Sequence, residues 1–189
     1  MKEVKSLAVF CGSSATSDQA IITDSLNLAR QLCAKGIRLV YGGGNVGLMG
    51  LIADEMLNHK GEVIGVIPEK LVGIEVAHRG LTELHVVSGM HERKALMAGF
   101  ADGFIILPGG IGTMEEFFEI FTWKQLGYHD KPVAIVNINS FYKPLLDFLH
   151  SMADRGFVAP GVIDQLIIEP DSERVLERML DVAGMKREA

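Results

Sequence analysis

Long hydrophobic runs are absent from this chain of 189 residues, and cysteine is rare. No stretch of about 18 apolar residues occurs, so the sequence predicts no membrane-spanning helix. The apolar residues 7–11 run directly into a glycine-serine loop, which predicts a first strand rather than a signal peptide. The two cysteines, Cys11 and Cys33, form neither a CxxC pair nor a metal-binding spacing. A reduced, cytoplasmic protein is the simplest interpretation of this pattern.

Positive charge is also in short supply, because 18 Lys and Arg residues stand against 24 Asp and Glu residues. The formal net charge of −6 at pH 7 argues against a nucleic-acid-binding surface, which needs a basic face. This balance does not exclude a single phosphate ligand, since local hydrogen-bond donors decide that. The six histidines form no HExxH or other metal-ligand spacing, so no metal is implied.

What the chain does contain is an alternation of short apolar runs with longer helical patterns. The predicted strands are residues 7–11, 37–41, 63–67, 84–87, 103–107, 133–136 and 166–168, and the predicted helices are residues 18–35, 48–59, 90–100, 112–126, 141–155 and 172–183. The alternation predicts an α/β fold, a Rossmann-like three-layer sandwich with a doubly wound, mostly parallel sheet of about seven strands and helices on both faces. We expect one domain over residues 1–189, with ligands at the carboxyl ends of the strands. We expect residues 69–81 to form a loop or a short helix over this site.

A glycine-rich segment follows the fifth apolar run. It reads Pro108-Gly109-Gly110-Ile111-Gly112-Thr113-Met114 and stands where a predicted strand gives way to a helix. Backbone N–H groups at a helix start have no intrahelical partner, and the helix dipole adds partial positive charge. Glycine also permits close approach to the backbone, and Thr113 adds a hydroxyl donor. The segment therefore predicts a phosphate cradle. The alternative is a turn that Thr113 caps.

Two carboxylates, Glu115 and Glu116, follow in the first helical turn, and Glu119 stands one turn further on. A loop made only to hold phosphate would gain nothing from them. Surface charge that complements the helix dipole is the alternative, and it suffices for Glu119. We expect Glu116 to be the catalytic carboxylate, because cleavage of a sugar–base bond passes through an oxocarbenium-like state that a nearby carboxylate stabilises.

A second glycine-rich turn, Gly42-Gly43-Gly44-Asn45-Val46-Gly47, matches the GxGxxG pattern. It follows the second predicted strand rather than the first, and no acidic residue ends the next strand to hold a ribose, so an NAD site is not favoured. Two interpretations stay open: a second backbone surface against a nucleotide, or a tight strand–helix turn. Ser13, in the loop after the first strand, either donates to a ligand at the same edge or belongs to a plain turn.

A basic pair opens the helix that follows the fourth strand. Arg93 offers a planar fork for a phosphate or a leaving base, and Lys94 offers a point charge. Adjacent residues on a helix point about 100° apart, so Glu92, Arg93 and Lys94 cannot all face the site. We expect Arg93 to face it, whereas Lys94 is left open between the site and a solvated surface.

Together, these motifs resemble the LOG ("lonely guy") proteins, which are cytokinin riboside 5′-monophosphate phosphoribohydrolases. Residues 42–50, residues 90–94 and the pattern PGGxGTxxE, met from Pro108 to Glu116, carry the resemblance. It implies a Rossmann-like fold, a homodimer and hydrolysis of a purine nucleoside 5′-monophosphate to free base and ribose 5-phosphate, with no metal and no other cofactor. An N6-modified adenine of the cytokinin type and the plain adenine of AMP are both open as the base.

The resemblance also implies roles for particular residues. Arg93 and Glu116 are the implied catalytic pair, and residues 110–113 are implied to hold the phosphate. The further residues implied to line the nucleotide pocket are Glu75, Lys94, Glu115 and Thr122. Members are often labelled "possible lysine decarboxylase", but no lysine in the sequence stands in a convincing pyridoxal phosphate site.

A different class of function stays open beside the enzyme. Related folds bind nucleotides or the molybdenum cofactor as carriers without cleaving them, and a fold does not decide a function. Arg93 together with Glu116 discriminates between the two classes, because a carrier needs no such pair.

Overall fold

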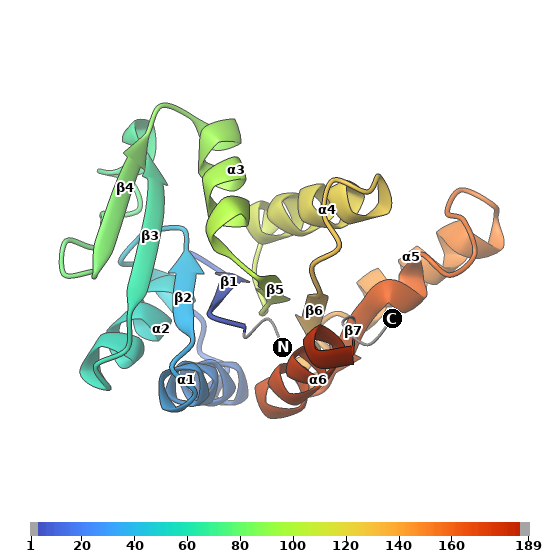
Figure 1. Cartoon of the computed structure of the whole chain (residues 1–189), viewed down its shortest axis with the longest axis horizontal. Helices are drawn as coiled ribbons and strands as arrows, with labels where there is room; N and C mark the ends of the chain where they lie inside the picture. Colours follow the sequence, from blue (N-terminus) through green and yellow to red (C-terminus); the bar gives the residue numbers. More distant parts are fainter. Residues whose placement is uncertain (1–3, 186–189) are drawn as a thin grey trace.

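The computed structural model describes residues 4–185, and within them the chain forms seven strands and six α-helices (Figure 1). The strands are β1 (Ser6–Phe10), β2 (Arg38–Tyr41), β3 (Val63–Pro68), β4 (Glu83–Val87), β5 (Gly103–Ile106), β6 (Val133–Val136) and β7 (Leu166–Glu169). The α-helices are α1 (Gln19–Ala34), α2 (Gly47–Asn58), α3 (Met90–Phe100), α4 (Ile111–Gln125), α5 (Lys143–Asp154) and α6 (Ser172–Met185). The short 3-10 helices are η1 (Glu69–Leu71), η2 (Ile138–Ser140) and η3 (Ile163–Gln165). Every predicted strand and helix is confirmed, with ends that differ by at most two residues.

The strands form one sheet in the order β4-β3-β2-β1-β5-β6-β7, and every neighbouring pair is parallel. The chain starts at the centre, builds outward from β1 to β4, then crosses back to β5 and builds outward on the other side. The direction of building therefore reverses between β1 and β5, which pair from Leu7 with Gly103 to Phe10 with Ile106. Such a switch point leaves a crevice at the carboxyl ends of the two strands.

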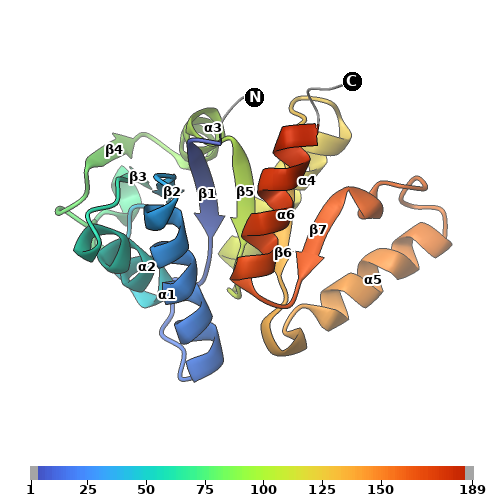
Figure 2. The ribbon, with the colours of Figure 1, turned by 60° about the horizontal axis from the view of Figure 1, so that its bottom comes forward.

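Helices cover both faces of the sheet (Figures 1 and 2). Side chains of β1 alternate between the two layers: Leu7 and Val9 pack with α1, α2 and α6, whereas Ala8 and Phe10 pack with α3, α4 and α5. Because both faces of the strands are buried, the strand sequences are continuously apolar rather than alternating. The prediction of a doubly wound, three-layer fold is confirmed.

The helix ends follow local sequence signals. The Asp18 carboxylate accepts hydrogen bonds from the N–H groups of Ala20 and Ile21 at 2.9 and 3.3 Å, which caps the start of α1. Gly36, with φ of +66°, follows the end of the same helix. Within residues 4–185, no helix combines the length and the apolar character needed to cross a membrane.

Candidate active site

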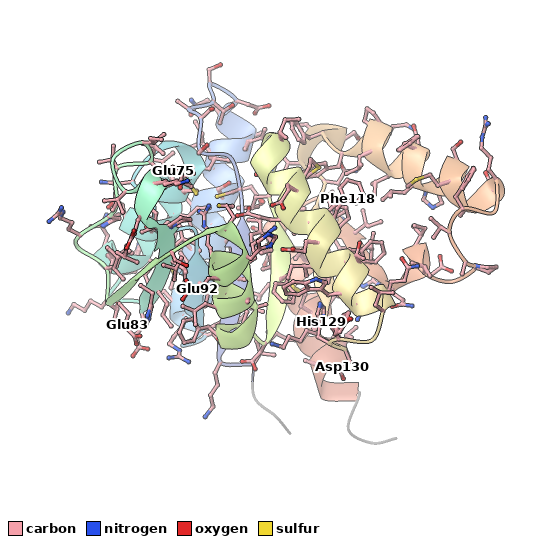
Figure 3. The ribbon with its side chains drawn as sticks, turned by 90° about the horizontal axis from the view of Figure 1, so that it is seen from above. Glu75, Glu83, Glu92, Phe118, His129 and Asp130 are labelled. Carbon is pink, nitrogen blue, oxygen red and sulfur yellow. The ribbon has the colours of Figure 1, made fainter. Side chains whose placement is uncertain are left out.

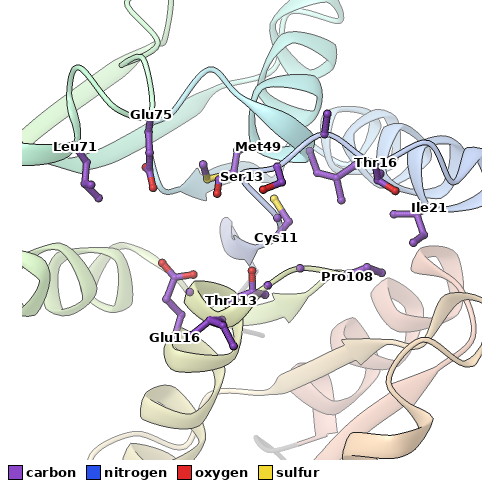
Figure 4. Close-up of a pocket in the computed structure, with 18 of the residues that line it drawn as sticks. Cys11, Ser13, Thr16, Ile21, Met49, Leu71, Glu75, Pro108, Thr113 and Glu116 are labelled. Carbon is purple, nitrogen blue, oxygen red and sulfur yellow. The ribbon is translucent and has the colours of Figure 1, made fainter.

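A cavity of about 460 Å³ opens at the carboxyl ends of β1 and β5 (Figure 4). It lies at the switch point of the sheet, where ligands bind in open α/β folds. Its walls come from the loop after β1, the turn after β5, residues 69–81 and the first turns of α1, α2, α3 and α4. The lining residues are Cys11, Gly12, Ser13, Ser14, Ala15, Thr16, Ile21, Leu48, Met49, Leu71, Glu75, Met90, Arg93, Pro108, Gly109, Gly110, Ile111, Gly112, Thr113, Glu116 and Phe141.

The turn after β5 forms the floor of the cavity and the start of α4. Gly109 lies so close to Thr113 that an added Cβ would stand 2.1 Å from the Thr113 hydroxyl oxygen. Gly110 is the N-cap of α4 and brings no side-chain cap, so the first N–H groups of the helix have no side-chain acceptor there. An added Cβ at Gly110 or Gly112 would meet no protein atom within 4 Å. The turn therefore presents helix-start amides to open space, which is the arrangement that binds anions.

Arg93 reaches the cavity from α3, and its side chain is buried. Its Nε donates to the Val66 carbonyl at 3.1 Å, and its Nη2 donates to the Gly42 carbonyl at 2.9 Å. Nη2 also lies 3.4 Å from Oε2 of Glu75. These contacts fix the guanidinium plane against the ends of β2 and β3, so the cation faces the cavity with little freedom to turn.

Glu116 stands in the second turn of α4 and is only 8% exposed. Burial raises its pKa from 4.5 to about 7, against the opposing charges of Arg93 and Lys94. The nearby carboxylates of Glu115 and Glu75 add to the shift. Figure 4 shows the Glu116 and Glu75 side chains pointing toward each other from opposite walls. A carboxyl group that changes charge near neutral pH in a concave site is a functional candidate.

Several residues with an expected role in binding lie outside the cavity lining. The Lys94 side chain is buried between α3 and α4, where it pairs with Glu115 and with Glu119 at 2.8 Å. Burial opposes its charge, but the hydrogen bonds to both carboxylates outweigh burial and raise the pKa of Lys94. Met114 and Thr122 do not line the cavity either. In this chain Lys94 joins two helices, and substrate contact by these residues stays a prediction.

The turn after β2 also stays outside the lining, with Gly42, Gly43 and Gly44 buried. A Cβ added at Gly42 would stand 2.1 Å from Nη2 of Arg93, and one at Gly44 would stand 3.0 Å from the Glu75 backbone. Of the two interpretations left open, these distances favour the tight turn. Its glycines make room for Arg93 and Glu75, and direct nucleotide binding by Gly43 and Gly44 stays a prediction.

The apolar part of the lining could not be predicted from the sequence. Leu71 comes from η1 and Phe141 from the link between η2 and α5, and no local motif marks either of them, whereas Met90 opens the motif of residues 90–94 but gave no signal of its own. Cys11 directly follows β1, so its place at a strand end was a usable signal. Within residues 4–185, no group of three or more His, Cys, Asp or Glu residues is placed to hold a metal ion.

The fold and the cavity define a Rossmann-like α/β protein with a helix-start site at the sheet's switch point. The molybdenum cofactor binding protein from the phototrophic bacterium Rippkaea orientalis has the same fold, with a TM-score of 0.73 and 18% identity over 97% of this chain and 99% of that one. The molybdenum cofactor carrier protein from Chlamydomonas reinhardtii gives a TM-score of 0.70 and 18% identity over 95% of this chain and 99% of that one. At this identity the likeness shows the fold alone.

Sequence comparison identifies the family. The family described as "Possible lysine decarboxylase" matches residues 49–179. A cytokinin riboside 5′-monophosphate phosphoribohydrolase from Rhodococcoides fascians is 48% identical over 170 residues, which are 89% of this chain and 86% of that protein. One from Arabidopsis thaliana is 41% identical over 177 residues, which are 94% of this chain and 83% of that protein. The chain belongs to this family, and the resemblance seen in its motifs is confirmed.

Proposed function

We propose that the protein hydrolyses the N-glycosidic bond of a purine nucleoside 5′-monophosphate, releasing free base and ribose 5-phosphate. One observation carries the proposal: the helix-start amides after β5, the Arg93 guanidinium and the Glu116 carboxyl group line the same cavity. An anion site next to a fixed cation and a carboxylate suits a phosphorylated sugar. The names of the relatives from Rhodococcoides fascians and Arabidopsis thaliana support the same reaction.

In the proposed mechanism the phosphate binds to residues 110–113 at the start of α4, which fixes the ribose near Glu116. The bond between C1′ and the base breaks, its electron pair leaves with the base, and positive charge develops on the sugar. The ionised Glu116 carboxylate stabilises that charge. Arg93 fixes the nucleotide and supports departure of the base. Water then adds to C1′ and loses a proton, and the departing base gains one, so the protons balance.

The base is proposed to be adenine, either plain or N6-modified. Both nucleotides share the phosphate and ribose that the helix start and Glu116 would contact. Leu71 and Met90 give part of the cavity an apolar wall, which suits a purine ring. The relatives' names favour the cytokinin-type, N6-modified base.

Product analysis tests the proposal. The purified protein is incubated with AMP and with N6-isopentenyladenosine 5′-monophosphate, and free base and ribose 5-phosphate are followed by chromatography. Release of both products in equal amounts is expected, and the ratio of rates assigns the base. A folded Glu116→Ala variant that keeps full turnover would contradict the role of Glu116.

A carrier is the second candidate, because the solved structures of this fold include proteins named for binding or carrying the molybdenum cofactor. The buried pair of Arg93 and Glu116 argues for the enzyme, since a carrier gains nothing from a carboxyl group that titrates near pH 7. Nucleotides that stay intact while calorimetry detects their binding would favour the carrier.

We also propose that the protein is a homodimer that associates through the outer side of α4 and the turn after it. Phe118 (Figure 3), Leu126 and Tyr128 are large apolar side chains that are exposed there. Charged substitutions such as Leu126→Glu and Tyr128→Glu should halve the mass measured by light scattering. Phe157→Glu is the matched control, because Phe157 is equally exposed but lies between α5 and β7. A wild-type protein with the mass of one chain would contradict the proposal.

A further inference from the structure

The segment that joins β3 to β4, residues 69–81 (the arm), places Glu75 in the wall of the cavity. Its regular structure is limited to η1, so its shape depends on contacts with the rest of the chain. Backbone hydrogen bonds tie it to the turn after β2: the Asn45 N–H donates to the carbonyls of Glu75 and Val76 at 3.0 and 2.8 Å, and the His78 N–H donates to the Gly43 carbonyl at 2.9 Å. The arm is therefore joined to this glycine turn directly beside Glu75.

The arm is strained at the residue after Glu75. Val76 has φ of 49°, in the left-handed region that a β-branched residue rarely adopts. Its neighbour Ala77 forms an antiparallel bridge with Gly44, which has no side chain to push the arm away. A strained backbone persists only when the surrounding contacts hold it in place. The arm therefore needs a strong anchor close to Val76.

His78 provides such an anchor. Its ring is buried, and its Nε2 lies 2.9 Å from Oδ1 of Asp54 on α2. The N–H of Gly80 donates to Nδ1 at 3.2 Å, so the ring proton is on Nε2 and points to Asp54. Neither His78 nor Asp54 lines the cavity. The pair thus fastens the arm to α2 from outside the site.

We infer that His78 and Asp54 are positioning residues for Glu75. They hold the arm in the strained conformation that points the Glu75 carboxylate into the cavity, 3.4 Å from Nη2 of Arg93. Without the pair, the backbone at Val76 relaxes and Glu75 turns away from the guanidinium. The inference rests on the proposed function, because the effect of moving Glu75 is measured as a change in the rate of base release.

A double-mutant cycle tests whether His78 acts through Glu75. Glu75→Gln removes the negative charge that faces Arg93, and we expect it to lower kcat roughly a hundredfold. His78→Ala keeps the charge but lets it move, and because a displacement of about 1 Å costs up to roughly a hundredfold in rate, we expect a loss of roughly tenfold. The double variant should lose no more than Glu75→Gln alone, because an arm without its carboxylate has nothing left to position. KM should change little, since the phosphate site is untouched. Losses that multiply in the double variant would overturn the inference.

Substitutions at Asp54 separate positioning from folding. The Asp54 side chain is more than half exposed, so its removal leaves no buried hole. Asp54→Asn keeps an acceptor for Nε2 of His78 and should retain most of the rate, whereas Asp54→Ala should match His78→Ala. His59→Ala is the matched control, because His59 pairs with Glu55 on α2 at 3.3 Å and has no part in the arm. Equal rates for wild type and Asp54→Ala would contradict the inference.

Hydrogen exchange provides a readout that needs no substrate. In His78→Ala and Asp54→Ala, the amides of residues 75–80 should exchange at least roughly tenfold faster than in wild type, while those of α1 and β7 stay unchanged. Unchanged exchange in the arm would overturn the inference even if the enzyme is active. If the wild-type protein releases no base but the arm exchanges faster in both variants, the proposed function would be contradicted and the anchor would stay supported.

Discussion

The two glycine-rich turns of this chain follow neighbouring parts of one sheet, yet they differ in what surrounds their glycines. In the turn after β2, the space beside the glycines is filled by protein: an added Cβ would stand 2.1 Å from Arg93 at Gly42 and 2.5 Å from the Ser13 backbone at Gly47. In the turn after β5, Gly109 is enclosed in the same way, with an added Cβ 2.1 Å from the Thr113 hydroxyl oxygen, but an added Cβ at Gly110 or Gly112 would meet nothing within 4 Å.

This difference separates two uses of glycine that share one sequence pattern. In the first turn, the missing side chains let protein approach protein, so that Arg93 and Glu75 reach the cavity. In the second turn, the missing side chains of Gly110 and Gly112 leave backbone amides open for a ligand. The first turn is thus expected to act on catalysis through Arg93 and on stability, and the second to act on binding.

The largest effect is expected at Glu116, which lies one helical turn beyond the glycine-rich turn after β5. Glu116→Gln should lower kcat by roughly a thousandfold, because it removes the charge that stabilises the developing cation. Steady-state kinetics of base release measure this. A Glu116→Gln variant whose kcat stays within about tenfold of wild type would show that the Glu116 charge does not stabilise the developing cation.

The same substitution should make the protein more stable. Because the pKa of Glu116 is raised from 4.5 to about 7 in the folded state, its contribution to stability is present below pH 4.5 and is lost as the pH rises through 7. At pH 8, Glu116→Gln should therefore raise the free energy of unfolding, by up to roughly 3 kcal/mol. Urea unfolding at pH 8 and pH 4.5 measures the difference, which should vanish at the lower pH.

The second largest effect on the rate is expected at Gly42, in the glycine-rich turn after β2. Gly42→Ala puts a methyl group 2.1 Å from the present position of Nη2 of Arg93, so the guanidinium must move. We expect kcat to fall roughly a hundredfold while the affinity for ribose 5-phosphate stays within a few-fold. Gly73→Ala, on the arm with no atom within 4 Å of its added Cβ, is the control. A Gly42→Ala variant with the kcat of wild type would contradict the claim that the glycines after β2 act on catalysis through Arg93.

The third effect is a pH dependence. Below the Glu116 pKa of about 7, the ionised fraction falls, so kcat should fall about tenfold for each further pH unit. Above pH 7 the rate should level off. A rate that is constant from pH 5 to pH 8 would show that ionised Glu116 is not required.

The smallest and most discriminating effects come from one alanine in each turn. Gly43 has φ of +77°, and its added Cβ would stand 3.1 Å from Ile67, which does not line the cavity. Gly43→Ala should therefore cost roughly 1–3 kcal/mol of stability and leave the KM of the folded fraction nearly unchanged. Gly112→Ala should keep or raise stability and increase KM several-fold. Thermal unfolding and steady-state kinetics of both variants check these two expectations. A loss of stability in the turn after β5 together with a higher KM in the turn after β2 would contradict the roles assigned to the two turns.

The sequence was sufficient for elements whose signals are local. The helix Met90–Phe100 and the strand Val133–Val136 have the predicted bounds, because periodicity and flanking residues define them. Ser13, Arg93, residues 109–113 and Glu116 could be grouped because strand ends of a parallel sheet share one edge. The structure confirms that they line one cavity.

The remaining features depend on tertiary packing. Sequence alone did not show that Lys94 turns toward Glu115 and Glu119 rather than the cavity, because adjacent residues on a helix differ only in direction. The contribution of Phe141 to the lining depends on where η2 ends, far along the chain from the motifs. The space beside the glycines of the turn after β2 is filled partly by the arm, and the residues of the arm carry no repeating pattern that predicts this contact.

The central claim is that the open turn binds a phosphate so that Glu116 can act on the attached ribose. The most direct test compares kcat/KM for N6-isopentenyladenosine 5′-monophosphate and AMP with kcat/KM for the same two nucleosides without phosphate. We expect each nucleotide to exceed its nucleoside by roughly a thousandfold or more, since the binding energy of the phosphate is used at the reacting bond. Equal values with and without phosphate would contradict the claim.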